Sequence, residues 1–594
     1  MNLKIRTGWF LTLVACLPTF AAKPPAAPAP PSFGETVEVN VVNVDVYVTD
    51  KNGNRVTGLK KEDFALSEEE KPVEITNFAA VAERVESPAI TAKPGIASEP
   101  RPGEPAPGPE SWLNLAVFVD NLHLRPENRA RALEQIRKFL AQTVRPLDRV
   151  MLASYDLGLR VRRPFTGDPA VLDTALRQME TLPSFGVQAD QARRSALRAM
   201  YSIHELNPCS FEMMGPIQSY AEQSRDEAQR TVGALKFLVN SLAGIPGRKA
   251  VLYVSDGVPV TPGEELFQAV YEICGGGTAT SGLPETNQGG KVAPGADAAG
   301  YPAQQALLDA QKYSIAERFE DLAAHANANR VAFYTLQASG LRGAAADPDL
   351  DPGERVLQLM TVQQVQRTNW QNSLSAMAAG TGGRAMLNTN DFLPDLGKMQ
   401  EDFSVYYSLA YTPAHAGDGR QHRIEVKVKR PGLKVRYRQS YRDKPLAERI
   451  VDRTLAALFH GIEDNPLEVS MEIGDPSLGE KGEYGVPIRL KIPIFKLAVL
   501  NQQETFRAKL RLLVATGDDQ GGISPVRQVE VPIEFPRKQV LNAMGKYYLY
   551  NLTLKMRSGE QRVAIAVRDE IGATTSYLSR PVTVGATAAA VVKP

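Results

Sequence analysis

Two continuous apolar segments, each followed by an aspartate, most constrain what this chain can fold into. Residues 115–119 (LAVFV) run directly into Asp120, and residues 250–254 (AVLYV) precede Ser255 and Asp256. A segment that is apolar at every position is typical of a strand buried on both faces of a parallel sheet. Segments with apolar residues at helical spacing, such as 216–242, lie between these runs. We therefore expect residues 111–405 to form an α/β domain with a doubly wound parallel sheet.

Both flanks of this domain have the alternating pattern of β-strands. Residues 36–85 contain valines at every second position and predict a small N-terminal β domain, and 406–445 predict a β-hairpin extension. Residues 446–590 hold longer alternating runs, which are typical of a β-sandwich. The expected fold is thus multi-domain, with the α/β domain between β domains.

Three segments have the composition of connecting chain. Residues 23–35 are rich in Pro and Ala, and 86–110 are rich in Pro, Gly and Glu, so both are expected to be linkers. Within the α/β domain, residues 261–302 are expected to be a flexible insertion, because much of this stretch is Gly, Ala and Pro. A single helix is predicted over about 303–329.

The N-terminus has the pattern of an export signal. Lys4 and Arg6 precede an apolar run at 9–17, and small residues follow near position 22, so residues 1–22 predict a cleaved signal peptide. Cys16 offers an alternative, because the preceding Leu-Val-Ala resembles a bacterial lipoprotein box. Either route places the protein in the periplasm, at the cell envelope or outside the cell. No later apolar run approaches the roughly 20 residues of a membrane-spanning helix.

Charge and motif content exclude several classes of function. The formal net charge is only +1, which does not indicate nucleic-acid binding. His204 and Glu205 lack the second histidine of a zinc protease helix, and Ser255 lacks the preceding glycine of a nucleophile elbow. We therefore predict that the chain is not an enzyme and that its partner is another protein.

The two aspartates are the strongest candidate site. Ligands of doubly wound sheets bind outside the carboxyl ends of the strands, where the strand order reverses. Asp120 and Asp256 both follow apolar strands, so we expect them at this edge together with Asn121 and His123. A structural alternative is that the acids cap neighbouring helices.

Several segments resemble a known family. LAVFVDNLHL at 115–124, VLYVSDG at 251–257 and SLSAMAAGTGG at 373–383 resemble a von Willebrand factor A domain. Residues 39–78 and 405–441, on either side, are similar to the von Willebrand factor A-related proteins of acidobacteria. The resemblance covers residues 36–442 and implies binding rather than catalysis.

The resemblance also implies a metal site, known as MIDAS, with Asp120 and Asp256 as its acids and Mg²⁺ as the usual ion. The two serine positions of the family motif hold Leu122 and Leu124, and no threonine lies at 184–188. Because Mg²⁺ requires oxygen ligands in octahedral geometry, we expect weak metal binding or none. His123 with the two acids would suit a transition metal in a hydrolase, but the favoured interpretation is that it hydrogen-bonds or packs at the rim of the crevice.

On the same model, Cys209 and Cys274 both lie at the carboxyl-end face of the sheet. We therefore expect a disulfide between them, with two separate thiols as the alternative. The sequence predicts an exported protein that binds a protein partner through a face formed by Asp120, Asn121, His123 and Asp256. The alternative function is an envelope scaffold in which the β domains make the contacts. The oligomeric state is not predicted.

Overall fold

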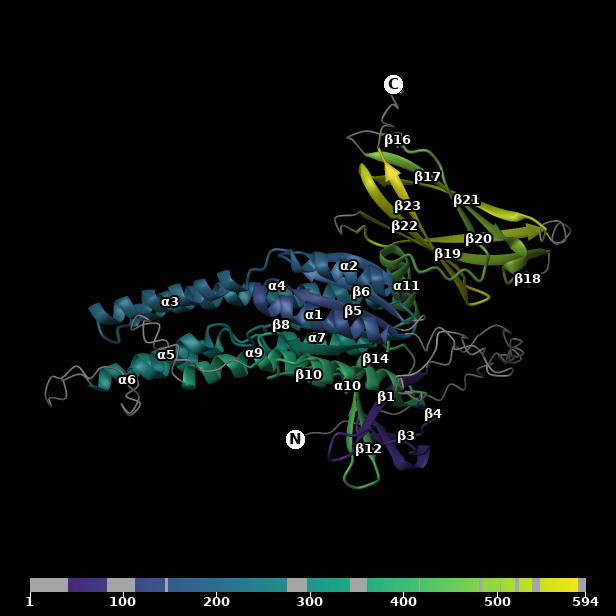
Figure 1. Cartoon of the computed structure of the whole chain (residues 1–594). Coiled ribbons are helices and arrows are strands. Elements are labelled where there is room, and N and C mark those ends of the chain that lie inside the picture. The colour runs from purple at the N-terminus through teal and green to yellow at the C-terminus, as the bar shows by residue number, and fades with distance from the viewer. Residues whose placement is uncertain are drawn as a thin grey trace, which may run out of the picture. The chain divides into compact units, whose positions relative to one another are not determined.

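The chain contains several sheets with helices packed among them, a multi-domain mixed α/β architecture (Figure 1). The computed structural model describes residues 41–82, 113–144, 148–274, 296–341, 360–415, 417–479, 483–502, 504–518, 523–536 and 545–585. The predicted signal peptide, Cys16 and the two predicted linkers lie outside the described residues.

A six-stranded sheet with the order β10–β9–β8–β5–β6–β7 contains both apolar runs. Its strands are β5 (Leu113–Asp120), β6 (Arg149–Tyr155), β7 (Leu159–Thr166), β8 (Arg248–Ser255), β9 (Val331–Gln337) and β10 (Ala385–Met386). All neighbouring strands pair in parallel except β7, which runs antiparallel to β6 at one edge. The expected parallel sheet is therefore present, and its strand order reverses between β5 and β8.

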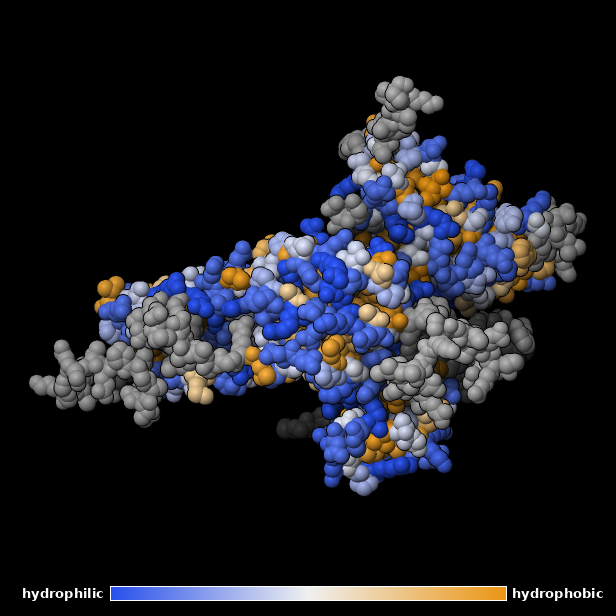
Figure 2. Space-filling view, in the orientation of Figure 1, coloured by the Kyte–Doolittle hydropathy of each residue, from blue (hydrophilic) through white to orange (hydrophobic). Residues whose placement is uncertain are grey.

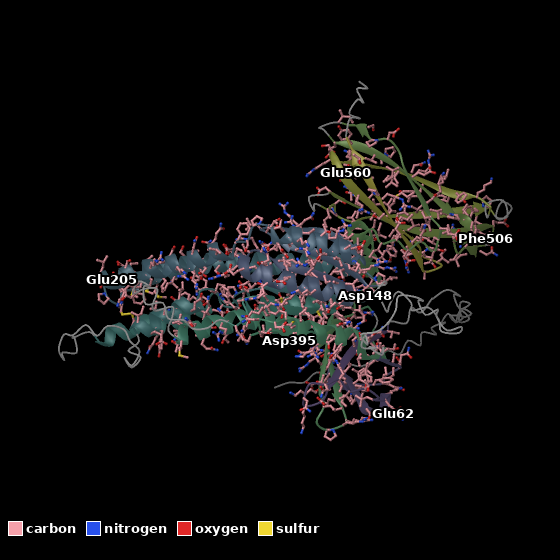
Figure 3. All side chains as sticks on the ribbon, in the orientation of Figure 1. Glu62, Asp148, Glu205, Asp395, Phe506 and Glu560 are labelled. Atoms are coloured by element: carbon pink, nitrogen blue, oxygen red, sulfur yellow. A yellow bond between two sulfur atoms is a disulfide. The ribbon has the colours of Figure 1, made fainter. Side chains whose placement is uncertain are left out.

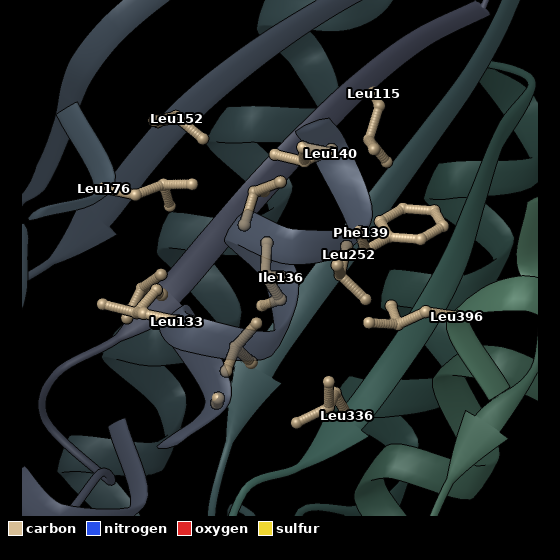
Figure 4. Packing of buried hydrophobic residues seen from close by; sticks show 14 of the residues in the cluster. Leu115, Leu133, Ile136, Phe139, Leu140, Leu152, Leu176, Leu252, Leu336 and Leu396 are labelled. Carbon is tan, nitrogen blue, oxygen red and sulfur yellow. The ribbon is translucent and has the colours of Figure 1, made fainter. Parts of the chain in front are cut away.

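Helices cover both faces of this sheet, which explains why its strands are apolar at every position. On one face α1 (Pro126–Thr143), α2 (Pro169–Glu180) and α10 (Leu393–Ser404) pack against strand residues such as Leu115 and Leu252 (Figure 4). On the other face α4 (Met214–Leu242), α7 (Ala316–Ala328) and α9 (Met360–Gly380) pack against Ala116 and Phe118. Two hydrophobic cores thus hold the sheet between two helix layers.

Further helices form a core of their own. We call α3 (Gly186–Leu206), the 3-10 turn Phe211–Met213, residues 214–221 of α4, α5 (Glu264–Cys274) and α6 (Ala296–Gln311) the helical extension. Leu197, Met200, Ile217 and Phe267 are among the residues of its separate hydrophobic cluster.

Two expectations about this part of the chain were wrong. Residues 264–274 of the predicted flexible insertion form α5, because Leu266, Phe267 and Val270 lie at helical spacing on a buried face. The predicted single helix at 303–329 is two helices, α6 and α7, which are separated by residues 312–315.

Strands from both sides of the α/β domain form two shared four-stranded sheets, β13–β1–β11–β4 and β14–β12–β2–β3. The strands are β1 (Val42–Thr49), β2 (Phe64–Glu68), β3 (Lys71–Val73), β4 (Asn77–Ala82), β11 (Val405–Tyr411), β12 (Gln421–Val428), β13 (Lys434–Tyr437) and β14 (Ser440–Arg442), with a 3-10 turn at Lys61–Asp63. β1 pairs with β11 so that Val44 lies opposite Leu409, and the alternate valines of β1 point into one core. The segments predicted as a domain at 36–85 and an extension at 406–445 therefore lie in the same sheets.

The C-terminal part begins with α11 (Leu446–His460) and continues with two antiparallel sheets. One contains β15 (Ser470–Ile473), β16 (Ser477–Leu478), β17 (Tyr484–Pro493) and β21 (Tyr547–Met556); the other contains β18 (Leu500–Gln502), β19 (Thr505–Asp518), β20 (Arg527–Pro536), β22 (Gly559–Asp569) and β23 (Thr574–Val584), and a 3-10 turn spans Ile494–Lys496. Both sheets contribute to one hydrophobic cluster. In the part of the chain that the structure describes, no helix is long and apolar enough to cross a bilayer.

The shared β core generates a stability prediction. Leu409 is completely buried opposite Val44, so Leu409→Ala should lower the free energy of unfolding by roughly 2–5 kcal/mol. Leu478→Ala is a matched control, because Leu478 is exposed on β16 and its truncation should change stability by less than about 0.5 kcal/mol. Urea denaturation followed by circular dichroism checks both, and equal effects of the two variants would contradict the shared core.

Candidate functional site

Asp120, at the end of β5, is fully buried and surrounded by hydrogen-bond donors. Its Oδ2 atom lies 2.8 Å from Nδ1 of His123 and accepts hydrogen bonds from the Tyr253 hydroxyl at 2.5 Å and the Ser255 hydroxyl at 3.3 Å. Its Oδ1 atom accepts from the backbone N–H groups of Leu122 at 3.2 Å and His123 at 3.3 Å. Both carboxylate oxygens are therefore occupied by the protein's own groups.

The electrostatics of this cluster favour an ion pair. Burial would raise the pKa of the Asp120 carboxyl, but the charge and hydrogen bonds of His123 and the Tyr253 hydroxyl lower it. Burial would lower the pKa of His123, but Asp120 raises it above its ordinary value. Burial and the adjacent Asp120 carboxylate raise the pKa of Tyr253, so its hydroxyl remains a donor. Asp120 is thus held ionised by the protein's own groups.

Asp256, which directly follows β8, is also buried and connects this strand to α1. Both of its carboxylate oxygens accept from the side-chain amide of Asn128, at 3.0 and 2.9 Å. The backbone N–H of Arg125, the residue before α1, donates to Oδ2 at 3.2 Å. A carboxylate at the first turn of a helix satisfies a free N–H group and complements the helix dipole, so Asp256 caps α1 from another strand.

Asn121 also connects neighbouring elements through hydrogen bonds. Its Oδ1 atom accepts from Nη1 of Arg129 at 3.0 Å, and its Nδ2 atom donates to Asp156 at 2.6 Å. The Arg129 guanidinium also donates to the backbone carbonyls of residues 180, 182 and 183, which lead into α3. Asp120, Asn121, His123 and Asp256 thus meet at one edge of the sheet, but all are buried rather than exposed as a binding face.

The helical extension covers this edge. The backbone N–H of Phe185 donates to the Asn121 carbonyl at 2.8 Å, and that of Gly186 donates to the Leu124 carbonyl at 3.1 Å. A Cβ atom at position 186 would lie only 2.5 Å from the Leu124 oxygen, so this close approach requires glycine. Arg125 then pairs with Asp190 of α3 at 2.8 Å.

The serine and threonine oxygen ligands that the sequence resemblance implies are not present at this site. Leu122 and Leu124 are buried in the cores on opposite faces of the sheet, and neither offers an oxygen. Residues 184–188 close over the turn after β5 instead of providing a threonine. These surroundings do not fit Mg²⁺, because the oxygens of Asp120 and Asp256 are directed to hydrogen-bond donors.

Potential metal-ligand groups occur elsewhere among the described residues. They comprise His204 with the two cysteines, Glu68 with His415 and His422, and His415 with Asp418 and Asp443, and none includes Asp120 or Asp256. Cys209 and Cys274 are joined by a disulfide with a Cα–Cα distance of 5.7 Å. This bond connects the turn between α3 and α4 to the end of α5.

Sequence reasoning did not identify the partners of the two acids. Asn128 follows Arg125 by one helical turn, so its place beside Asp256 could have been inferred from the predicted helix start. Tyr253 was counted only as part of an apolar strand, and nothing in local spacing indicates its bond to Asp120. The helix α3 was missed, although Leu197 and Met200 have helical spacing and are buried.

Comparisons with known proteins do not identify a family for this chain. No protein-family model and no curated protein matches the chain. Among solved structures, an aerotolerance-related membrane protein from Bacteroides fragilis is 11% identical over 49% of this chain and 98% of its own, with a TM-score of 0.22. The conserved hypothetical protein BatB from Bacteroides thetaiotaomicron is 10% identical over 49% of this chain and 97% of its own, with a TM-score of 0.19. Three N-terminal domains of the pilus tip protein Mfa5 from Porphyromonas gingivalis are 10% identical over 92% of this chain and 78% of that one, with a TM-score of 0.21. These TM-scores are too low to support conclusions about fold or function.

The Asp120–His123 pair predicts a pH-dependent contribution to stability. Because the folded pKa of His123 is raised, the stabilisation is fully present below the unfolded pKa of about 6.5 and is lost as the pH rises through the folded pKa. His123→Gln should therefore destabilise the protein by roughly 1.5–3 kcal/mol at pH 6 and by less at pH 9, in urea denaturation.

His460 provides a control with the opposite sign. Burial lowers its pKa to about 4, so the wild type loses stability relative to His460→Gln as the pH falls from about 6.5 towards 4. A pH-independent difference between wild type and His123→Gln would contradict the ion pair.

Proposed function

We propose that this chain is an exported protein that binds another protein through a divergent von Willebrand factor A domain. The proposal for the fold is supported by the sequence resemblance and by the strand order, with its reversal between β5 and β8 and its antiparallel edge strand β7. The binding is proposed to be independent of metal, since the crevice acids are engaged in internal hydrogen bonds. No motif found in the sequence supports catalysis.

The observation that carries the binding proposal is an apolar tip on the helical extension. Leu206, the last residue of α3, is 88% exposed, and Phe211, in the turn before α4, is 53% exposed. Figure 3 places the neighbouring Glu205 at the far end of α3, and Figure 2 shows hydrophobic surface at the same end. Aromatic side chains are enriched in protein interfaces, and an exposed apolar patch that contains one is a candidate contact surface.

The tip is held rigidly by the structure behind it. Cys209, between the two exposed residues, is bonded to Cys274 of α5. Met213 and Met214, which follow Phe211, are buried in the core of the helical extension. A contact surface that is already ordered loses little conformational entropy on binding, so a small apolar area can contribute useful affinity.

Export is part of the same proposal. The predicted signal peptide at 1–22 would direct the chain to the periplasm, the envelope or the exterior, and lipidation of Cys16 would anchor it at the envelope. The Cys209–Cys274 disulfide supports this location, because disulfides persist in oxidising compartments.

A second candidate function, an envelope scaffold, is favoured by an observation in the C-terminal part. We infer that the two antiparallel sheets of strands β15 to β23 form a β-sandwich, since they share one hydrophobic cluster. Within the described residues, β21 pairs only with β17, and Tyr547 and Leu549 of β21 are exposed. An edge strand with exposed apolar residues can add a strand from another chain.

Site-specific photocrosslinking distinguishes the two functions. A photoreactive residue is placed at Glu205 beside the tip, or at Asn551 on β21, in the full-length protein, which is irradiated with an envelope fraction. We expect one discrete adduct from position 205, and its yield should fall at least about tenfold in Phe211→Ser, because an interface anchor is lost.

Leu478→Ser removes an equally apolar exposed residue elsewhere and should leave the adduct unchanged. An adduct from position 551 alone would favour the scaffold. No adduct from position 205, or one insensitive to Phe211→Ser, would overturn binding through the tip.

A further inference from the structure

A cluster of imidazole and carboxylate groups lies in the shared β sheets, far in sequence from the crevice acids. His415, in the turn between β11 and β12, has Nδ1 at 3.3 Å from Asp443 Oδ2 and 4.0 Å from Asp418 Oδ2. Its other ring nitrogen, Nε2, lies 3.4 Å from Glu68 Oε1. Ligand atoms of His415, Asp418 and Asp443 all lie within 4.8 Å of one another, a spacing at which one ion could contact all three.

The two sides of the His415 ring are not equivalent as ligand positions. On the Nε2 side the second imidazole is His422, whose ring stacks on His415 with centroids 3.8 Å apart and planes inclined by 17°. Nearly parallel rings direct their in-plane lone pairs side by side, so the two imidazoles do not converge on one ion. On the Nδ1 side the other candidate ligands are the carboxylates of Asp418 and Asp443, and both oxygens of Asp418 lie 3.2 Å from His422 Nε2.

The distances on the Nδ1 side suit a small divalent ion. Bonds of about 2.0–2.2 Å from Zn²⁺ to nitrogen and oxygen place two ligand atoms of a tetrahedral site roughly 3.3–3.6 Å apart. The distance of 3.3 Å from His415 Nδ1 to Asp443 Oδ2 lies at the lower end of this range. Asp418 is 28% exposed, and its carboxylate would turn from His422 Nε2 towards the ion. One imidazole with two carboxylates is a ligand set for a divalent transition metal.

Backbone amides orient both carboxylates. The N–H of Gly417 donates to Asp443 Oδ2 at 2.7 Å, and the N–H of Arg420 donates to Asp418 Oδ1 at 2.8 Å. Gly417 has a φ of +61°, a left-handed conformation that favours glycine and directs this turn around the cluster. The turn therefore presents the ligands in a fixed arrangement.

The Glu68 carboxylate lies beside Nε2 of His415, on the side of the ring away from the proposed ion. Its Oε1 atom accepts hydrogen bonds from the hydroxyls of Tyr411 at 2.9 Å and Tyr441 at 2.5 Å. Burial and the Glu68 carboxylate raise the pKa of both phenols, so they remain donors. His415 Nε2 is buried and, among the described residues, has no hydrogen-bond partner. A metal on Nδ1 would set the tautomer with a proton on Nε2, facing Glu68, as in carboxylate–histidine–metal triads.

Local charge also favours a cation. Three carboxylates, those of Glu68, Asp418 and Asp443, surround His415. Of the neighbouring basic residues, Arg442 pairs with Glu448, and Lys444 pairs with Asp452. A divalent ion would offset the negative charge of the cluster.

We propose that His415, Asp418 and Asp443 bind one Zn²⁺ ion, with Glu68 as the hydrogen-bond partner of the liganding imidazole. The ion would tie the turn after β11 to the end of β14 and, through Glu68, to β2. Glu68 and Tyr411 are 343 residues apart in sequence, so the site would stabilise pairing between distant parts of the chain. This proposal is independent of the proposed binding function.

Isothermal titration of the metal-free full-length protein with ZnCl₂ tests the site. We expect saturation at one equivalent and a higher thermal unfolding temperature with Zn²⁺. Asp418→Asn, at the more exposed ligand, should weaken binding at least about tenfold, and Glu68→Gln about 10–100-fold. Asp395→Asn, at a half-buried aspartate paired with Lys398, is the matched control and should bind like the wild type.

Circular dichroism of the metal-free variants verifies that each remains folded. If Glu68→Gln disturbs the β core, because Glu68 is buried, Asp418→Asn alone tests the site. Absence of saturable binding, or wild-type affinity in Asp418→Asn, would overturn the proposal. Loss of binding in His204→Gln instead would place the ion beside the cysteines and overturn it as well. Equal competition by Mg²⁺ or Ca²⁺ would overturn the assignment to a transition metal.

Discussion

The buried carboxylate of Asp120 is the constraint on which the centre of this molecule depends. An ionised carboxyl group without solvent is very unfavourable unless donors and an opposite charge surround it. Here the donors come from the next strand, through Tyr253 and Ser255, and the opposite charge comes from His123 in the turn after β5. Satisfying this charge therefore determines how the two central strands and their turn fit together.

The same edge of the sheet is a junction between elements rather than an open crevice. Asp256 joins β8 to the start of α1, and Asn121 with Arg129 joins the turn after β5 to the segment that leads into α3. In open parallel sheets this position usually receives the ligand. Because the protein's own groups fill it here, we infer that recognition has moved to the exposed tip of the helical extension.

Local sequence patterns were sufficient for the central strands. The apolar runs predicted β5 and β8, and their parallel pairing places Asp120 and Asp256 at one edge, as expected. The Cys209–Cys274 bond that was expected from this topology is present. These features could be predicted because the burial of a strand on both faces, and its direction in the sheet, are determined by short segments of the sequence.

Long-range features could not be predicted in this way. The pairing of β1 with β11 and the cluster of Glu68 with His415 join residues that are distant in sequence, and no local pattern indicates them. The segment that closes over the turn after β5 leads into α3, whose N-cap residue, Phe185, makes no side-chain cap, so the helix lacks the usual start signal. Sequence alone therefore placed the acids correctly but did not reveal what covers them.

Hydrogen–deuterium exchange at the turn after β5 tests most directly whether the protein's own groups fill the crevice. The backbone amides of Leu122 and His123 donate to Asp120, so the account predicts slow exchange that is the same with and without added Mg²⁺. Rapid exchange that becomes slow only when Mg²⁺ is added would contradict it, because the carboxylate would then be a metal ligand in an open site.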